Sequence, residues 1–172
     1  MADQRAAEKN FDAGDGLESA GNDNRPQATP LADAYVVKDI SRVKRSLVAG
    51  GRQVGESQEC VALVKHVIPE IGRAANWAEG TKIKGYNDPP LEPGTALATF
   101  KDGKYENKPT GNHAGIFLGY EQRDGRDGFV LLEQWRGARG KPREQFIPFD
   151  ALNHETIRQA QNYSVIRRSL PK

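Results

Sequence analysis

The chain has 172 residues, which is enough for one ordinary globular domain and too few for two full-sized ones. Its 25 Lys and Arg residues against 23 Asp and Glu residues give a formal net charge of +2. That balance does not favour nucleic acid or an anionic membrane as a partner, and we expect neither. Hydrophobic residues make up 37% of the chain and its mean hydropathy is −0.72, so part of it is not expected to enter a core.

The lean part is the N-terminal segment, which we expect to be a flexible leader over residues 1–31. Positions 1–30 carry six acidic and three basic residues, with Phe11 and Leu17 as the sizeable apolar side chains after Met1. Such a composition does not offset the entropy lost on ordering. Residues 32–172 are then expected to form the folded domain.

The single cysteine, Cys60, excludes an intrachain disulfide and a cysteine-rich zinc site. The three histidines do not form a His-rich motif, so we expect no metal and no cofactor. No stretch approaches the ~18 consecutive apolar residues of a membrane span, and the N-terminus lacks a secretory signal. We therefore expect synthesis in the cytoplasm and, where the protein leaves the cell, a route that needs no such signal.

Two helices are predicted in the first half of the domain. Apolar residues recur at helical spacing between positions 36 and 47 and Gly50-Gly51 supplies a stop, which predicts a helix over 37–49. Ser57 is expected to cap a second helix that begins at Cys60 and that Pro69 must kink or end. Glu59, placed in its first turn, would suit the positive end of the helix dipole.

The second half of the domain is predicted to consist of strands separated by turns. Expected strands cover residues 95–100, 113–120, 129–135, 144–149 and 163–167, and the second and third are joined across a loop at 123–128. Helices followed by a run of strands predict an α+β domain in which the helices pack on an antiparallel sheet.

Cys60 has two interpretations. On a helical wheel it lies on the same face as the apolar residues that follow it, which is typical of a buried structural cysteine. At a helix N-terminus, however, the dipole and the free N–H groups favour the nucleophilic thiolate. His66 points away from Cys60 around the same helix, and both His66 and His154 are expected on the surface.

His113 is the better candidate for a base because it begins a strand of small and apolar residues. Period-two alternation puts His113 on one face with Gly115, Phe117 and Gly119, and puts Ala114, Ile116, Leu118 and Tyr120 on the other. The two glycines leave space for another backbone or a ligand. The next strand ends in Glu133 and Gln134, which alternation sends to opposite faces. Either could orient an imidazole, and the sequence leaves the choice between them open.

This order of residues resembles a known family. Cys60 in Gln-Glu-Cys-Val-Ala-Leu-Val, His113 in Gly-Asn-His-Ala-Gly-Ile-Phe-Leu-Gly and the segment Leu-Glu133-Gln134-Trp135 resemble the CHAP amidases among the NlpC-type, papain-like cysteine hydrolases. The resemblance covers about Ala34 to Arg168 and is greatest to small bacterial proteins, some of which are toxic effectors delivered by type VI secretion.

The resemblance implies a papain-like α+β fold and hydrolysis of amide bonds in peptidoglycan stem peptides. It assigns Cys60 as the nucleophile, His113 as the base and then the acid, and Glu133 or Gln134 as the third catalytic residue. The family commonly has Gln directly before the Cys, whereas here Gln58 lies two positions before it. The backbone N–H of Cys60 is therefore the first candidate for the oxyanion donor and Gln58 the second. Trp77, Asn112 and Trp135 are candidates for substrate contact, and both tryptophans are equally compatible with packing.

The function expected from the sequence is thus a peptidoglycan amidase or endopeptidase. A second expectation is that it acts as a secreted antibacterial effector, with a cognate immunity protein and a secretion machine as partners. The expected oligomeric state is a monomer. One alternative is a non-catalytic module of the same fold that binds the wall or a partner protein. Another is a cysteine hydrolase or deamidase that acts on proteins, since one triad serves acyl transfer on several substrates.

Overall fold

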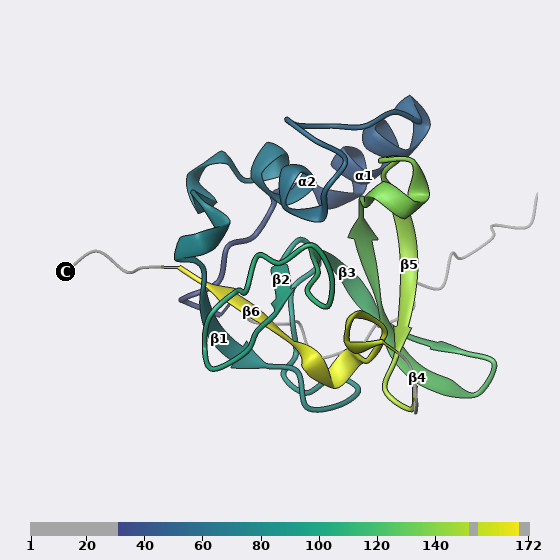
Figure 1. Cartoon of the computed structure of the whole chain (residues 1–172). Coiled ribbons are helices and arrows are strands. Elements are labelled where there is room, and N and C mark those ends of the chain that lie inside the picture. Colours follow the sequence, from purple (N-terminus) through teal and green to yellow (C-terminus); the bar gives the residue numbers. More distant parts are fainter. Residues whose placement is uncertain (1–30, 152–154, 169–172) are drawn as a thin grey trace, which may run out of the picture.

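The computed structural model describes residues 31–151 and 155–168, and Figure 1 shows its α+β arrangement. The helices are α1 (Ile40–Gly50) and α2 (Cys60–Val67), and the 3₁₀ helices are η1 (Pro69–Ile71), η2 (Ala74–Asn76), η3 (Arg136–Ala138), η4 (Thr156–Arg158) and η5 (Ala160–Asn162). The strands are β1 (Ala78–Lys82), β2 (Ala96–Thr99), β3 (Ala114–Arg123), β4 (Arg126–Glu133), β5 (Arg143–Pro148) and β6 (Tyr163–Arg167). They form one antiparallel sheet in the order β1-β6-β2-β3-β4-β5.

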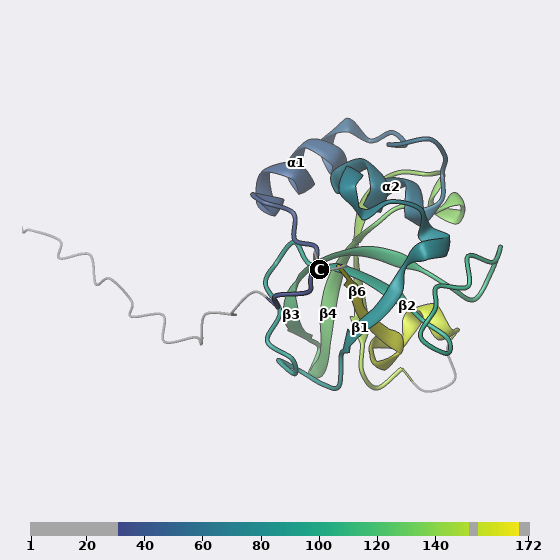
Figure 2. The same ribbon diagram turned by 90° about the vertical axis from the view of Figure 1, so that its left-hand side faces the viewer.

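The sheet is buried on both faces. Helices α1 and α2 lie over one face, where Leu63 and Val64 of α2 share a core cluster with Ile116 and Leu132 of the sheet (Figures 1 and 2). The opposite face packs a second cluster of aromatic and aliphatic residues under the loops that follow β1 and precede β6, with members that include Ile83, Leu91, Phe117, Phe129, Ala160 and Tyr163. The predicted α+β class with helices on an antiparallel sheet is confirmed.

The first helix begins later than its apolar periodicity predicts. Val36 forms a β-bridge with Thr95, and the N–H of Val37 donates to the carbonyl of Gly94 at 2.9 Å. These valines therefore belong to an extended segment, and the helix starts after Asp39, whose side chain accepts from the N–H of Arg42. The predicted stop is confirmed, because Gly51 takes the left-handed conformation and its N–H donates to Val48.

The second helix begins at Cys60 and ends at Val67, before Pro69, as predicted. The predicted cap is wrong. Glu59 occupies the N-cap position without a side-chain bond, and the Ser57 hydroxyl accepts from the N–H of Glu59 at 3.3 Å instead of reaching into the helix. Glu59 also precedes the first turn, and it forms an ion pair with Arg136 of η3 at 2.8 Å.

All five predicted strands are present: β6 has the predicted ends, and the ends of the other four shift by one to three residues. The loop predicted at 123–128 is instead a two-residue turn, because Asp124 and Gly125 both adopt positive φ angles of 50° and 74° and the strands continue up to them. Strand β1 was not predicted, since Ala-Glu-Gly-Thr-Lys has no apolar alternation.

Strand β3 does not alternate along its full length. A register shift between Phe117 and Gly119 interrupts its pairing with β4. Tyr120 consequently lies on the same side as Phe117, with ring centroids 4.9 Å apart, and not on the face of Ala114 and Ile116 as predicted.

The predicted leader at residues 1–31, except Leu31, and the predicted surface position of His154 fall outside the described residues. Among residues 31–151 and 155–168, no helix combines the length and the apolar character needed to cross a membrane.

Candidate active site

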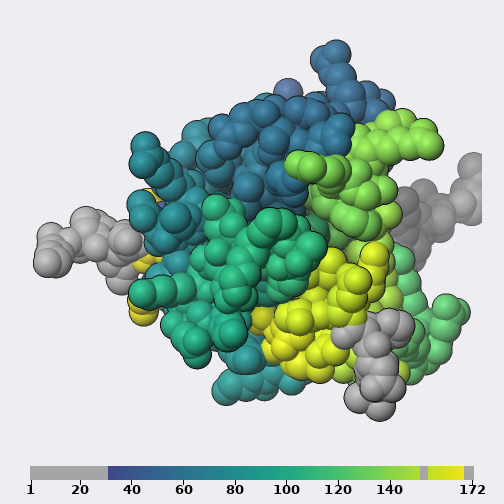
Figure 3. All heavy atoms as spheres, in the orientation of Figure 1, coloured from purple at the N-terminus to yellow at the C-terminus, as the bar shows by residue number. Residues whose placement is uncertain are grey.

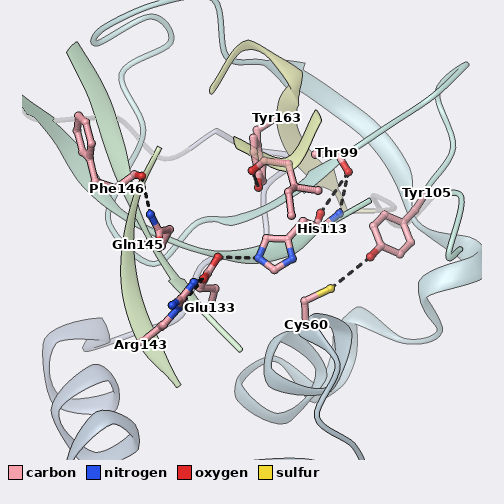
Figure 4. Close-up of polar contacts among 10 residues, drawn as sticks. Cys60, Thr99, Tyr105, His113, Glu133, Arg143, Gln145, Phe146 and Tyr163 are labelled. Carbon is pink, nitrogen blue, oxygen red and sulfur yellow. Dashed lines mark hydrogen bonds and ion pairs between the residues drawn. The ribbon is translucent and has the colours of Figure 1, made fainter. Parts of the chain in front are cut away.

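Cys60 is the first residue of α2, and its side chain points into the space between the helix and the sheet (Figure 4). The residue is 7% exposed. Its Sγ atom lies 3.5 Å from Oη of Tyr105, and the His113 imidazole faces it (Figure 4). Both interpretations of the sequence therefore hold in part, because the thiol is buried among apolar neighbours and also faces a histidine.

Strand pairing holds the backbone of His113, which immediately precedes β3. The N–H of His113 donates to Oγ1 of Thr99 at 2.9 Å, and the N–H of Thr99 donates to the His113 carbonyl at 2.9 Å. The imidazole lies between Cys60 and Glu133, with Nε2 turned to Glu133 and Nδ1 on the side of the thiol (Figure 4). The pairing of His113 with Thr99 thus fixes the backbone from which this side chain extends.

Glu133, the last residue of β4, is 3% exposed and uses both of its oxygens. Oε2 lies 2.8 Å from Nε2 of His113, and Oε1 accepts from Nε of Arg143 at 2.8 Å. Arg143 stands directly opposite Glu133 in the β4–β5 ladder. The buried carboxylate is therefore paired with a histidine on one side and an arginine on the other.

The close approach of β3 to β4 requires Gly115. A Cβ atom at this position would lie 2.6 Å from both Cγ of Leu131 and the carbonyl oxygen of Leu132. The space that the sequence predicted beside this glycine is therefore filled by the neighbouring strand. At Gly119, where a Cβ would meet nothing within 4 Å, the backbone is at the register shift and has a φ of 151°.

The electrostatics of the site favour a thiolate next to an imidazolium. Burial alone would raise the pKa of Cys60, but its interaction with the nearby His113, with smaller contributions from Tyr105 and the Ala114 N–H, lowers it below its ordinary value. Burial likewise opposes the charge of His113, yet its interactions with Cys60 and Glu133 raise its pKa to about 9. The pKa of Glu133 is lowered against the effect of burial by His113 and Arg143.

Gln134 has a different position from Glu133. It is fully buried, and its side chain binds the loop that leads into α2: Oε1 accepts from the N–H of Val54 at 2.8 Å, and Nε2 donates to the carbonyls of Val54 and Ser57 at 3.1 and 2.8 Å. The alternative left open by the sequence is thus decided by geometry, because Glu133 faces the imidazole and Gln134 fixes the backbone in front of Cys60.

Two further candidates, Gln58 and Trp77, contact other parts of the chain. Gln58 is exposed and packs against Gly140, where a Cβ would come within 2.7 Å of its Cγ. Trp77 is only 3% exposed, its ring lies 5.1 Å from that of Tyr105, and its indole N–H donates to the Ile71 carbonyl. Of the two interpretations of Trp77, the structure shows packing, since the ring is part of the core.

The remaining two candidates lie at the edge of the site. Asn112 is half-buried, and its Nδ2 donates to Oη of Tyr105 at 3.0 Å while its Oδ1 accepts from the N–H of Lys108. Trp135 is half-buried between Gly137 and the guanidinium of Arg143, which lies 5.6 Å from the ring centroid. Both positions leave contact with a substrate a prediction.

The sequence did not single out Tyr105, the residue in contact with the thiol. It belongs to the connection between β2 and β3, which covers the front of the molecule between the helices and the C-terminal segment in the space-filling view (Figure 3). The sequence signal that could have indicated it is a single aromatic residue within the polar run Lys-Asp-Gly-Lys-Tyr-Glu-Asn-Lys. In the structure Tyr105 is only 4% exposed. A surface hollow of about 520 Å³ adjoins Tyr105 and is lined by Lys101, Asp102, Lys104, Glu106 and Lys108.

The assembled side chains supply the parts of nucleophilic thiol chemistry: a thiolate, an imidazole that can exchange its proton, and a carboxylate that holds the imidazole. Within residues 31–151 and 155–168, no three His, Cys, Asp or Glu side chains come together as ligands for a metal ion.

Comparison with known proteins gives a consistent result. The sequence profile of the family described as domesticated amidase effector 2 (Dae2) matches residues 31–166. A type VI secretion amidase effector 2 protein from Salmonella typhi is 33% identical over 111 residues, which is 64% of this chain and 78% of that protein. A solved structure of type 6 secretion amidase effector 2 (Tae2) superposes with a TM-score of 0.58 at 27% identity, covering 79% of this chain and 96% of that one.

Proposed function

This chain belongs to the Dae2 family of domesticated amidase effectors, and from that premise we propose that it is a cysteine amidase that cleaves amide bonds in peptidoglycan stem peptides. Cys60 is the nucleophile, His113 the acid–base group and Glu133 the residue that orients His113. The order of a helix cysteine, a histidine at the start of a strand and a carboxylate one strand later supports a papain-like hydrolase of the NlpC or CHAP type.

The reaction proceeds through an acyl-enzyme. The Cys60 thiolate attacks the amide carbonyl carbon, an S–C bond forms, and the carbonyl π electrons move to oxygen to give an oxyanion. When the oxyanion collapses, the C–N bond breaks and His113 gives its proton to the leaving amine. Water then attacks the thioester with His113 as its base, which releases the acid and restores the thiolate.

The observation that carries this proposal is the row of side chains in which Cys60 points toward His113, His113 is bound to Glu133, and Glu133 is bound to Arg143 (Figure 4). Each member is held by an element of the sheet or by the start of α2, so the geometry is fixed before a substrate binds. Cys60 is the first residue of α2, so its backbone N–H has no acceptor within the helix. This N–H can therefore donate to an oxyanion.

Digestion of purified peptidoglycan tests the proposal. Wild-type protein and Cys60→Ala are incubated with sacculi, and released fragments are identified by mass spectrometry. We expect new muropeptides with free stem-peptide ends from the wild type alone. A control variant, His66→Ala, changes a histidine on the same helix that does not face the site and should retain full activity. Equal release by the wild type and Cys60→Ala, or by neither, contradicts the proposal.

The relative from Salmonella typhi is named as a type VI secretion effector, and this supports delivery of the present chain to the periplasm of a target cell. A producing cell would then need an immunity protein against it. Expression with and without a periplasmic targeting signal tests this part of the proposal: growth arrest only with the signal, abolished by Cys60→Ala, supports it, and equal growth in both cases opposes it.

A further inference from the structure

The contact between Tyr105 and the thiol gives this residue a role that the Cys-His-Glu chain does not include. The Tyr105 hydroxyl lies 3.5 Å from Sγ of Cys60, and the residue is buried to 4% exposure (Figure 4). We propose that Tyr105 is a catalytic residue that donates its hydroxyl proton in a hydrogen bond to the oxyanion formed during acyl transfer. The inference rests on the function proposed above and adds a residue to the same site.

The environment of Tyr105 fixes the direction in which its hydroxyl can donate. Nδ2 of Asn112 donates to Oη at 3.0 Å, so one acceptor position of the hydroxyl oxygen is taken and its proton is available for the thiol side. The ring is held by Trp77 and Phe100, whose centroids lie 5.1 and 6.4 Å away. Burial and the neighbouring thiolate also raise the pKa of Tyr105, so that it keeps its proton.

The position of the hydroxyl matches the place where negative charge develops. In the tetrahedral intermediate the oxyanion is bonded to the carbon that is itself bonded to Sγ, so a donor in contact with Sγ lies within reach of that oxygen. Before attack the hydroxyl faces the thiolate, and as the S–C bond forms the negative charge moves to the substrate oxygen while the tyrosine keeps its proton. The hydrogen bond therefore follows the charge without a proton transfer or a co-reactant.

The donor expected from the family pattern is not available in this position. Glu59 occupies the position directly before Cys60, and Gln58, two positions before it, is exposed and packs against Gly140. The backbone N–H of Cys60 can supply one hydrogen bond to the oxyanion. Tyr105 supplies a second from the connection between β2 and β3. A tyrosine on the β2–β3 connection thus takes the role that a side-chain amide before the cysteine would otherwise have.

The test compares Tyr105→Phe with wild type and with Tyr120→Phe. Tyr120 is a matched control because its hydroxyl donates to the Pro89 carbonyl at 2.6 Å, on the other face of the sheet from Cys60. Two rates are measured: hydrolysis of purified peptidoglycan over a range of sacculus concentrations, and alkylation of Cys60 by iodoacetamide at a pH where the thiol is fully ionised. Alkylation consumes the thiolate but forms no oxyanion. It therefore separates an effect of the hydroxyl on the thiolate from its effect on the oxyanion.

We expect Tyr105→Phe to lower kcat about 100-fold with little change in KM, as the loss of one oxyanion donor does, and to leave the plateau alkylation rate within about threefold of wild type. Tyr120→Phe should change neither rate. Unchanged hydrolysis by Tyr105→Phe, or an equal loss of hydrolysis and alkylation, overturns the inference. If the wild type is alkylated but digests no peptidoglycan, the proposed function itself fails and the inference falls with it.

Discussion

Glu133, at the end of β4, holds the imidazole of His113, which directly precedes β3, with its Oε2 atom 2.8 Å from Nε2, and both residues are almost fully buried. The second carboxylate oxygen is occupied by Arg143, which pairs with Glu133 across the β4–β5 ladder. A buried carboxylate bonded on both sides has little freedom to turn, so it defines the direction of the histidine ring as well as its charge.

The thiolate–imidazolium pair predicts a bell-shaped pH profile for hydrolysis. On the acid side activity is lost as Cys60 becomes protonated, at a pH below the ordinary thiol pKa of 9.0, because His113 lowers the pKa of the thiol. On the alkaline side it is lost near pH 9, where His113 gives up the proton that the leaving amine needs. Alkylation of Cys60 by iodoacetamide should show the acid limb only. An alkylation rate that first rises around pH 9 contradicts the predicted pair.

Substitution of Glu133 by Gln should narrow this profile from both ends. Without the carboxylate, burial lowers the pKa of His113, and a less charged imidazole stabilises the thiolate less, so the pKa of Cys60 rises. We expect a loss of about 100-fold in kcat/KM near neutral pH. Glu144→Gln changes an exposed neighbour on β5 and should leave the profile unchanged. Equal profiles for the two variants would show that Glu133 has no effect on the histidine.

Replacement of Gln134 by Ala should lower stability without changing the ionisation of His113. The variant removes the partners of the N–H and carbonyl of Val54 and of the Ser57 carbonyl, and an unsatisfied buried group costs about 1–3 kcal/mol. Urea unfolding of the variant measures this cost. Gln122→Ala is the control, because the Gln122 side chain binds Asp127 on the exposed surface. A loss for Gln134→Ala that does not exceed that of the control argues against the anchoring role.

Introduction of a methyl group at Gly115 should disturb the site through the sheet. In Gly115→Ala the new Cβ would lie 2.6 Å from both Cγ of Leu131 and the Leu132 carbonyl oxygen, which forces β3 and β4 apart. We expect this overpacking to lower the free energy of unfolding by about 1–3 kcal/mol. His113, directly before β3, and Glu133, at the end of β4, then move apart, so the alkylation rate at neutral pH should fall together with the unfolding midpoint. Gly50→Ala is the control, since a Cβ there meets nothing within 4 Å. Unchanged values for Gly115→Ala would mean that the strands relax without effect on the site.

Local sequence patterns predicted most of the elements. The start of α2 at Cys60, its end before Pro69 and the five strands from β2 to β6 follow from periodicity, turn residues and proline, all of which act over a few residues. The failures are also physical. Val36 and Val37 have helical spacing but pair with the segment before β2. Strand β1 has no apolar alternation to predict it, since it is a strand through its pairing with β6.

The sequence by itself determined which residues could do chemistry: one cysteine at a helix start, a histidine at a strand start, and a carboxylate next to an amide at a strand end. Only the tertiary structure decided that Glu133 meets His113 while Gln134 anchors the loop, that Trp77 is buried, and that Tyr105, 45 residues from Cys60, contacts the thiol. The reason is that such contacts depend on strand register and on the path of the connection between β2 and β3, which are set by long-range packing and not by neighbouring residues.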